Sequence, residues 1–108
     1  MGYSTNFSLE LVDVYDPKIE DAIIDKLKDL DVIYYALNED LSSYEAVNWY
    51  DYENDMLSLS RAFPDVHFIL HGLGAANEDI WEHHFIGGKE AKYRAEIFIP
   101  PLNMDDLE

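Results

Sequence analysis

The stretch "YSTNFSLELVDVYDPKIEDAIIDKLKDL", residues 3–30, indicates how the fold begins. Its first half alternates apolar and polar side chains, which predicts a β-strand with one buried face. That face would carry Tyr3, Thr5, Phe7, Leu9, Leu11 and Tyr15. The second half repeats apolar residues every three or four positions, which is the pattern of a helix with one apolar stripe. Asp16 is a suitable N-cap and Pro17 suits the first helical position, so the helix is predicted to begin there.

The residues after position 30 predict a second set of strands around a second helix. "VIYYAL" (32–37) and "YEAVNWY" (44–50) are rich in β-branched and aromatic residues, and both are predicted strands on either side of the turn "NEDLSS". Asp51 is predicted to cap a helix whose inner face carries Tyr52, Met56, Leu59 and Phe63. Further strands are predicted at 66–74, 79–86 and 90–99. Gly87-Gly88 forms the last hairpin turn in this prediction, and Pro100-Pro101 ends the final strand.

This order of elements predicts an α+β domain. We expect a ferredoxin-like βαββαβ arrangement with two additional C-terminal antiparallel strands and both helices packed on one face of the sheet. The single domain is predicted to span residues 1–102, and residues 103–108 form an acidic tail. The other face of such a sheet would be partly bare.

The charge of the chain limits its partners. The 108 residues include 7 Lys and Arg against 23 Asp and Glu, for a net charge of −16. From Asp29 to Gly88, Arg61 is the single basic residue. Such a field repels nucleic acid, anionic membranes and acidic substrates, and it attracts basic protein surfaces. We therefore expect a basic protein partner and no direct nucleic-acid or membrane binding. The alternative is that the charge serves only solubility.

The N-terminal residues and the lack of cysteine predict a cytoplasmic protein. The N-terminal "MGYSTNFSLE" has neither the basic nor the apolar region of a signal peptide. The chain has no cysteine, so disulfides and thiolate sites are excluded. No apolar run reaches the length of about 18 residues that a membrane-spanning helix needs.

The four histidines raise the possibility of a metal site. His67 and His71 lie four apart on a predicted strand, where the rise per residue separates them by roughly 13 Å, so they cannot share an ion. His83 and His84 are adjacent and would point to opposite faces. Zinc sites normally show closer ligand spacing on helices or loops. We therefore expect no metal.

No enzyme motif is present in the sequence. Glu78, Asp79 and Glu82 surround Trp81, but paired catalytic carboxylates also need a pocket and opposed pKa values. "HGLGAAN" (71–77) lacks the third glycine and the following helix of a dinucleotide-binding fingerprint, so its glycines are expected to shape a hairpin or bulge. We predict that the protein is not an enzyme and uses no cofactor.

Acidic and aromatic residues interleave in "VNWYDYENDM", residues 47–56. If this stretch is extended, carboxylates at alternate positions lie about 6.5–7 Å apart, close to the spacing of phosphates along a nucleic acid strand. If it begins a helix, the same carboxylates line the N-terminal turn and favour the helix dipole. Acidic side chains would attract a basic partner, and tyrosine side chains would contact it once it is bound. Together they would form a binding surface. The predicted surface consists of Glu39, Asp40, Glu45, Trp49, Tyr50, Asp51, Tyr52, Glu53 and Asp55.

Residues 48–89 resemble small proteins carried by phages and other mobile elements. The shared pattern is a Trp-Tyr-acid strand end, a Ser-x-x-aromatic-Pro-Asp step, a Phe-x-Leu-x-Gly-x-Gly strand, an Asp-x-Trp and a Gly-Lys turn. In this chain those positions are Trp49, Tyr50, Asp51, Ser60, Phe63, Pro64, Asp65, Phe68, Leu70, Gly72, Gly74, Asp79, Trp81, Gly88 and Lys89. The resemblance implies a ferredoxin-like sheet and no activity.

In composition, the chain is also similar to anti-CRISPR and other DNA-mimic inhibitors. The leading hypothesis from the sequence is a non-enzymatic inhibitor that binds the basic nucleic-acid-binding surface of a host protein, such as a CRISPR effector. The alternative is a general protein–protein interaction module or homodimer of a mobile element with no charge mimicry.

Overall fold

The computed structural model describes residues 4–74, 79–95 and 104–106. Along the chain, its strands and helices are β1 (Thr5–Val12), α1 (Pro17–Asp29), α2 (Tyr52–Ala62), β2 (His67–Gly74), β3 (Ile80–Ile86), β4 (Lys89–Arg94) and the short 3₁₀ helix η1 (Met104–Asp106). The predicted strand end at Pro100-Pro101 and the continuation of the last strand from residue 96 lie outside the described residues.

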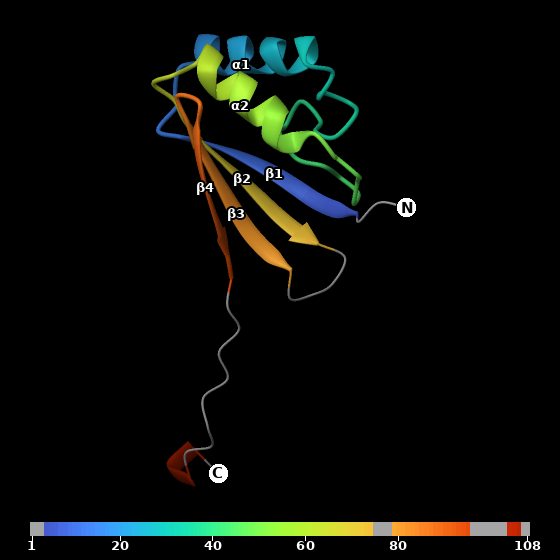
Figure 1. Cartoon of the computed structure of the whole chain (residues 1–108), viewed down its shortest axis with the longest axis vertical. Helices are drawn as coiled ribbons and strands as arrows, with labels where there is room; N and C mark the ends of the chain where they lie inside the picture. Colours follow the sequence, from blue (N-terminus) through green and yellow to red (C-terminus); the bar gives the residue numbers. More distant parts are fainter. Residues whose placement is uncertain (1–3, 75–78, 96–103, 107–108) are drawn as a thin grey trace.

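Four strands form one antiparallel sheet in the order β1-β2-β3-β4, and both helices lie on the same side of it (Figure 1). The order along the chain is therefore β-α-α-β-β-β. The predicted ferredoxin-like βαββαβ arrangement is wrong, because the two strands that it required between the helices do not form. The two helices instead follow one another, joined by residues 30–51 (Figure 1).

Residues 32–37 form a compact turn and not the predicted strand. Helix α1 ends where the Val32 amide donates to the Leu27 carbonyl over 2.9 Å, and Asp31 takes a left-handed φ of 61°. This is a Schellman ending, which turns the chain back toward the helix. The Val32 carbonyl then accepts hydrogen bonds from the amides of residues 35–37, and Val32, Ile33, Ala36 and Leu37 are buried. Burial of these four side chains in the core overrides their β-propensity.

Residues 44–50 do not form the predicted strand either. They follow the outer edge of β1, where Thr5 and Val47 exchange two backbone hydrogen bonds of 2.9 Å. Upstream, Ser43 donates its amide to the Phe7 carbonyl and Leu9 donates to the Leu41 carbonyl. The outward backbone groups of Thr5 and Phe7 and the Leu9 amide are thereby paired without a regular fifth strand, and this part of the edge is protected from pairing with another chain.

The predicted helices and the last hairpin are confirmed. Asp16 caps α1 by accepting from the Lys18 amide over 2.9 Å, and Pro17 is its first residue. In α2, Met56 and Leu59 are fully buried as the apolar stripe predicts. Gly87 and Gly88 link β3 to β4 with φ values of 55° and 81°, which the primed two-residue turn requires.

The core lies between the helices and the inner face of the sheet, and Trp81 is one of its buried residues. Gly72 faces Trp81 across the β2–β3 pair, and a Cβ atom at Gly72 would lie 2.1 Å from the indole ring. The indole also meets Phe7 edge-on, with ring centroids 5.9 Å apart. The sequence analysis expected Gly72 to shape a hairpin or a bulge. Its role is instead to leave room for the close approach of a large ring.

No helix in the described part of the chain is long and apolar enough to cross a membrane.

Candidate functional site

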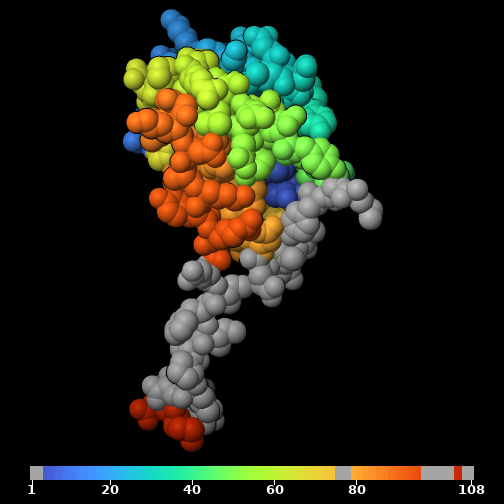
Figure 2. Space-filling view, in the orientation of Figure 1, coloured from blue at the N-terminus to red at the C-terminus, as the bar shows by residue number. Residues whose placement is uncertain are grey.

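The connection between the helices, residues 30–51, is the most unusual part of the described fold, and we call it the acidic loop. Its charged residues are all acidic: Asp31, Glu39, Asp40, Glu45 and Asp51. Connections of this length without regular structure are uncommon in compact domains and are often functional. Figure 2 shows the loop, in cyan to green, along one side of the molecular surface beside α2.

The backbone of the acidic loop is held in unusual conformations. Tyr34 and Leu41 have φ values of 69° and 67°, a left-handed region that costs most non-glycine residues energy. Tyr34 is held there by the bond from its amide to the Leu37 carbonyl, at 2.7 Å. Leu41 closes a tight turn in which its amide donates to the Asn38 carbonyl over 2.8 Å. Strained residues of this kind cluster at binding sites, where the surrounding structure maintains them.

Four exposed tyrosines project from the loop and from its end: Tyr34, Tyr35, Tyr44 and Tyr50. They are between 58% and 74% exposed, although tyrosine normally buries much of its ring. These four rings therefore lie outside the core.

Two of the tyrosines are bonded to loop carboxylates. The Tyr34 hydroxyl donates to Glu39 over 2.7 Å, and Lys28 lies 3.4 Å from the same carboxylate. The hydrogen bond from Tyr34 and then the charge of Lys28 lower the pKa of Glu39. In the same way, a hydrogen bond from the Ser42 hydroxyl lowers the pKa of Asp40, and Asp40 raises the pKa of Tyr44. Both carboxyl groups therefore have a lower pKa than an unpaired carboxyl group, which favours their charged form.

Two shallow hollows lie between these side chains. One, of about 250 Å³, is lined by Tyr34, Tyr44 and Glu45 among others. The second, of about 400 Å³, is lined by Tyr35, Tyr50 and Asp51 among others. Tyr35 borders both hollows and is fixed by its hydroxyl, which donates to the Asn48 carbonyl over 3.0 Å. Each hollow combines aromatic rings with a carboxylate.

The structure divides the nine residues of the predicted binding surface into two groups. Six are exposed, namely Glu39, Asp40, Glu45, Tyr50, Asp51 and Glu53. The other three are turned into the fold: Trp49 is 4% exposed, and Tyr52 and Asp55 are half-buried. Trp49 donates its indole N–H to Asp55 over 2.8 Å, so this carboxylate is used inside the protein.

Of the two interpretations of Asp51, Glu53 and Asp55, the helical one applies, since α2 begins at Tyr52. The extended spacing that would match phosphates does not occur. Asp51 occupies the N-cap position, and its carbonyl accepts from the Asp55 amide over 3.0 Å, but its side chain makes no capping hydrogen bond. The Asp51 carboxylate therefore remains directed to solvent, at the rim of the second hollow.

Tyr52 belongs to a chain of polar contacts that the sequence analysis did not find and in which only His83 is buried. Lys92 donates to the Tyr52 hydroxyl over 3.0 Å, and that hydroxyl lies 3.1 Å from His83 Nδ1. His83 Nε2 lies 2.8 Å from Glu90. Because the ammonium only donates and the carboxylate only accepts, Lys92 donates to Tyr52 and His83 donates from Nε2 to Glu90. The hairpin register, which places His83 opposite Lys92, would have indicated this chain.

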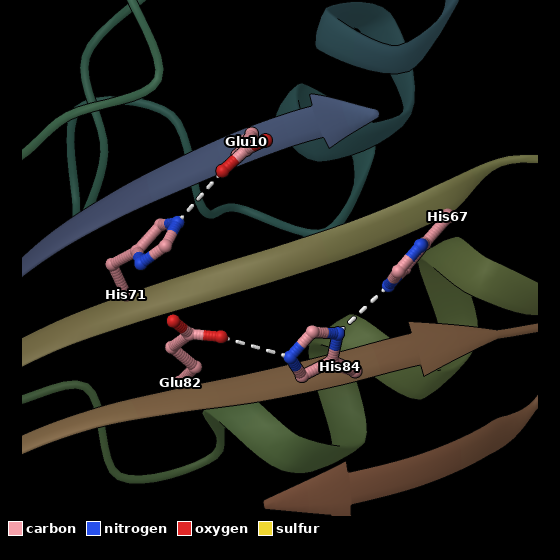
Figure 3. A network of polar contacts seen from close by, with 5 residues as sticks. All are labelled: Glu10, His67, His71, Glu82 and His84. Atoms are coloured by element: carbon pink, nitrogen blue, oxygen red, sulfur yellow. Dashed lines mark hydrogen bonds and ion pairs between the residues drawn. The ribbon is translucent and has the colours of Figure 1, made fainter. Parts of the chain in front are cut away.

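The other three histidines lie on the sheet face away from the helices (Figure 3). His67 Nε2 and His84 Nδ1 are 2.8 Å apart, and His84 Nε2 lies 3.0 Å from Glu82. His71 lies 2.9 Å from Glu10 on the neighbouring strand. His67 and His71 have separate partners, and His83 and His84 point to opposite faces, as the sequence predicts for the second pair. Within the described residues, no group of three or more metal-ligating side chains could hold an ion.

Comparison with known proteins finds no match: no family model, curated protein or solved structure is detectably similar to this chain. The resemblance of residues 48–89 to proteins of phages and mobile elements therefore stays a prediction.

Proposed function

We propose that the protein is a non-enzymatic binding protein that occupies the basic, nucleic-acid-binding surface of another protein. The observation that carries this proposal is the acidic loop, in which exposed tyrosines and ionised carboxylates occur without a single basic residue of the loop itself. In this proposal the partner is a host defence protein such as a CRISPR effector, and binding takes place in the cytosol and blocks access of nucleic acid.

The two hollows suggest how a basic partner would be held. An arginine or lysine side chain that enters one of them meets tyrosine rings and a carboxylate together. Aromatic faces attract cations, and a carboxylate offers a charge-assisted hydrogen bond to the same group. The mimicry would therefore act through sites that recognise the cations of the partner, and not through a regular row of carboxylates.

The charge of the whole chain supports the same proposal. A net charge of −16 would accelerate association with a basic surface and repel nucleic acid that competes for it. Exposed ion pairs are screened within about 8 Å at physiological ionic strength. Binding is therefore expected to weaken as salt rises.

The first experiment is affinity capture from nuclease-treated bacterial lysate, with elution by a salt gradient and identification by mass spectrometry. We expect a basic nucleic-acid-binding protein to elute at moderate salt, and added DNA to compete with the bound chain. If no basic protein is enriched, the charge serves solubility alone and the proposal fails.

A charge-reversal variant tests whether the acidic loop is the binding surface. Glu39→Lys, Asp40→Lys and Glu45→Lys together should abolish capture of the partner. The matched control is Asp21→Lys, Asp25→Lys and Asp29→Lys, which changes the net charge equally at exposed positions of α1. If both triple variants lose binding to the same extent, total charge and not the loop is responsible.

A further inference from the structure

The side of the sheet away from the helices is uncovered by any other described element, and we call it the open face. Strand alternation assigns to it every second residue of each strand. These residues are Asn6, Ser8, Glu10, Val12, His67, Ile69, His71, Leu73, Ile80, Glu82, His84, Ile86, Lys89, Ala91 and Tyr93. Leu73, Ile80, Ile86 and Tyr93 are each more than 40% exposed. Apolar side chains gathered in this way commonly mark an interface.

The open face is nearly neutral in a strongly acidic chain. It carries two carboxylates, one lysine and three histidines, whereas the acidic loop carries five acids and no base. Two copies of a chain with a charge of −16 repel one another over most of their surfaces. The repulsion is smallest where both copies present their open faces, and there the apolar side chains supply attraction. A basic partner, in contrast, gains little from this face.

Five polar side chains of the open face already have partners within one copy, namely Glu10, His67, His71, Glu82 and His84. Since a carboxylate only accepts, His84 donates from Nε2 to Glu82 over 3.0 Å, and its Nδ1 lies 2.8 Å from His67 Nε2 (Figure 3). His71 donates to Glu10 over 2.9 Å. These groups need few new hydrogen bonds from a partner, which lowers the cost of removing them from water.

We propose that two copies of this chain associate through their open faces, with the paired sheets stacked and the acidic loops directed outward. The strands of this face have six to eight residues. At the usual strand dimensions, the face measures about 450 Å² and the two copies together about 900 Å². That is at the low end for specific complexes, so the dimer is weak and reversible.

Analytical ultracentrifugation of the full chain over a wide concentration range tests the proposal. The mass should rise from the 12.5 kDa of one chain toward twice that value. It should rise further when salt is added, because salt screens the repulsion between the remaining acidic surfaces. Capture of a basic partner responds to salt in the opposite direction, so each proposal can fail alone. A single-chain mass at every concentration would overturn this one.

Two matched variants locate the contact. Leu73→Asp with Ile80→Asp should keep the chain monomeric at all concentrations tested. Ala22→Asp with Ala46→Asp adds the same charge at exposed positions off the open face and should leave dimerisation within about twofold of the wild type. Circular dichroism checks that each variant is folded, and Tyr93→Ser, at the sheet edge, should weaken the dimer severalfold. Equal loss of dimer in both double variants would reject the open face as the contact.

Discussion

Tyrosines in two regions of this protein have opposite surroundings. In the acidic loop, Tyr44 and Tyr50 are 73% and 69% exposed. Against the inner face of the sheet, Tyr52 of α2 stacks on Trp81 with ring centroids 5.3 Å apart, and its hydroxyl contacts His83 and Lys92. Tyr50 and Tyr52 are the same residue type and lie only two positions apart in the sequence. The comparison teaches that position relative to the sheet, and not composition, decides which aromatic residues stabilise the fold and which remain available to a partner.

The largest effect should come from removing the central ring of the inner face. Trp81→Ala is expected to lower the free energy of unfolding by about 3–5 kcal/mol, because it empties the space between Phe7, Gly72 and Tyr52. The matched loop variant Tyr50→Ala should change it by less than about 0.5 kcal/mol. Urea denaturation measures both. Similar losses of stability in the two variants would show that the loop is part of the cooperative core, and that Trp81 and Tyr50 do not differ in their contribution to stability.

For partner binding, the loop tyrosines should matter more than the aromatic residues of the core. Tyr44→Ala with Tyr50→Ala should weaken binding of the captured partner by at least about tenfold, as expected for exposed tyrosines at the centre of an interface. Isothermal titration calorimetry with the purified partner measures the change. Tyr15→Ala is the control, because Tyr15 is 84% exposed but lies outside the loop. An equal effect at Tyr15 would show that the loop has no special role.

Alkaline pH should distinguish Tyr52 from the exposed tyrosines. Burial, followed by the charges of Glu53 and Glu90, raises the pKa of Tyr52 from 10.0 to about 12. Between pH 10 and about 12, the unfolded chain has released the Tyr52 proton that the folded chain still holds. The contribution of Tyr52 to the free energy of unfolding is therefore complete below pH 10 and is lost as the pH rises through that window. Tyr52→Phe should therefore lose less stability than the wild type across that window in thermal melts. Parallel losses in the two proteins would place Tyr52 in water.

The smallest effect should come from relaxing the start of the acidic loop. Asp31 has a left-handed φ of 61° directly after α1, a position that favours glycine, and its charge is unfavourable at a helix C-terminus. Asp31→Gly is expected to raise the free energy of unfolding by up to about 1 kcal/mol, measured by denaturation. Partner binding should weaken slightly or stay unchanged. A loss of stability would mean that the Asp31 side chain supports the loop.

Prediction from the sequence succeeded where a local pattern and the final packing agree. The alternation in β1 and the capping by Asp16 needed no knowledge of distant contacts, and the Gly87-Gly88 turn fixed its own register. It failed at residues 32–37, whose β-branched and aromatic side chains are equally suited to a buried turn. Within the predicted binding surface, Trp49 is buried and Tyr50 is exposed, and this difference depends on the direction in which each ring turns, which the sequence pattern does not give.

The sequence by itself determined the helices, the hairpin, the strongly acidic character and the excess of tyrosine, because these follow from short-range spacing and from composition. Only the tertiary structure decided that residues 30–51 would run along β1 as a strained loop, and that His83 would be buried while His84 meets His67 on the open face. The physical reason is that these outcomes depend on contacts between residues far apart in the chain, whose packing and hydrogen bonds outweigh local preference.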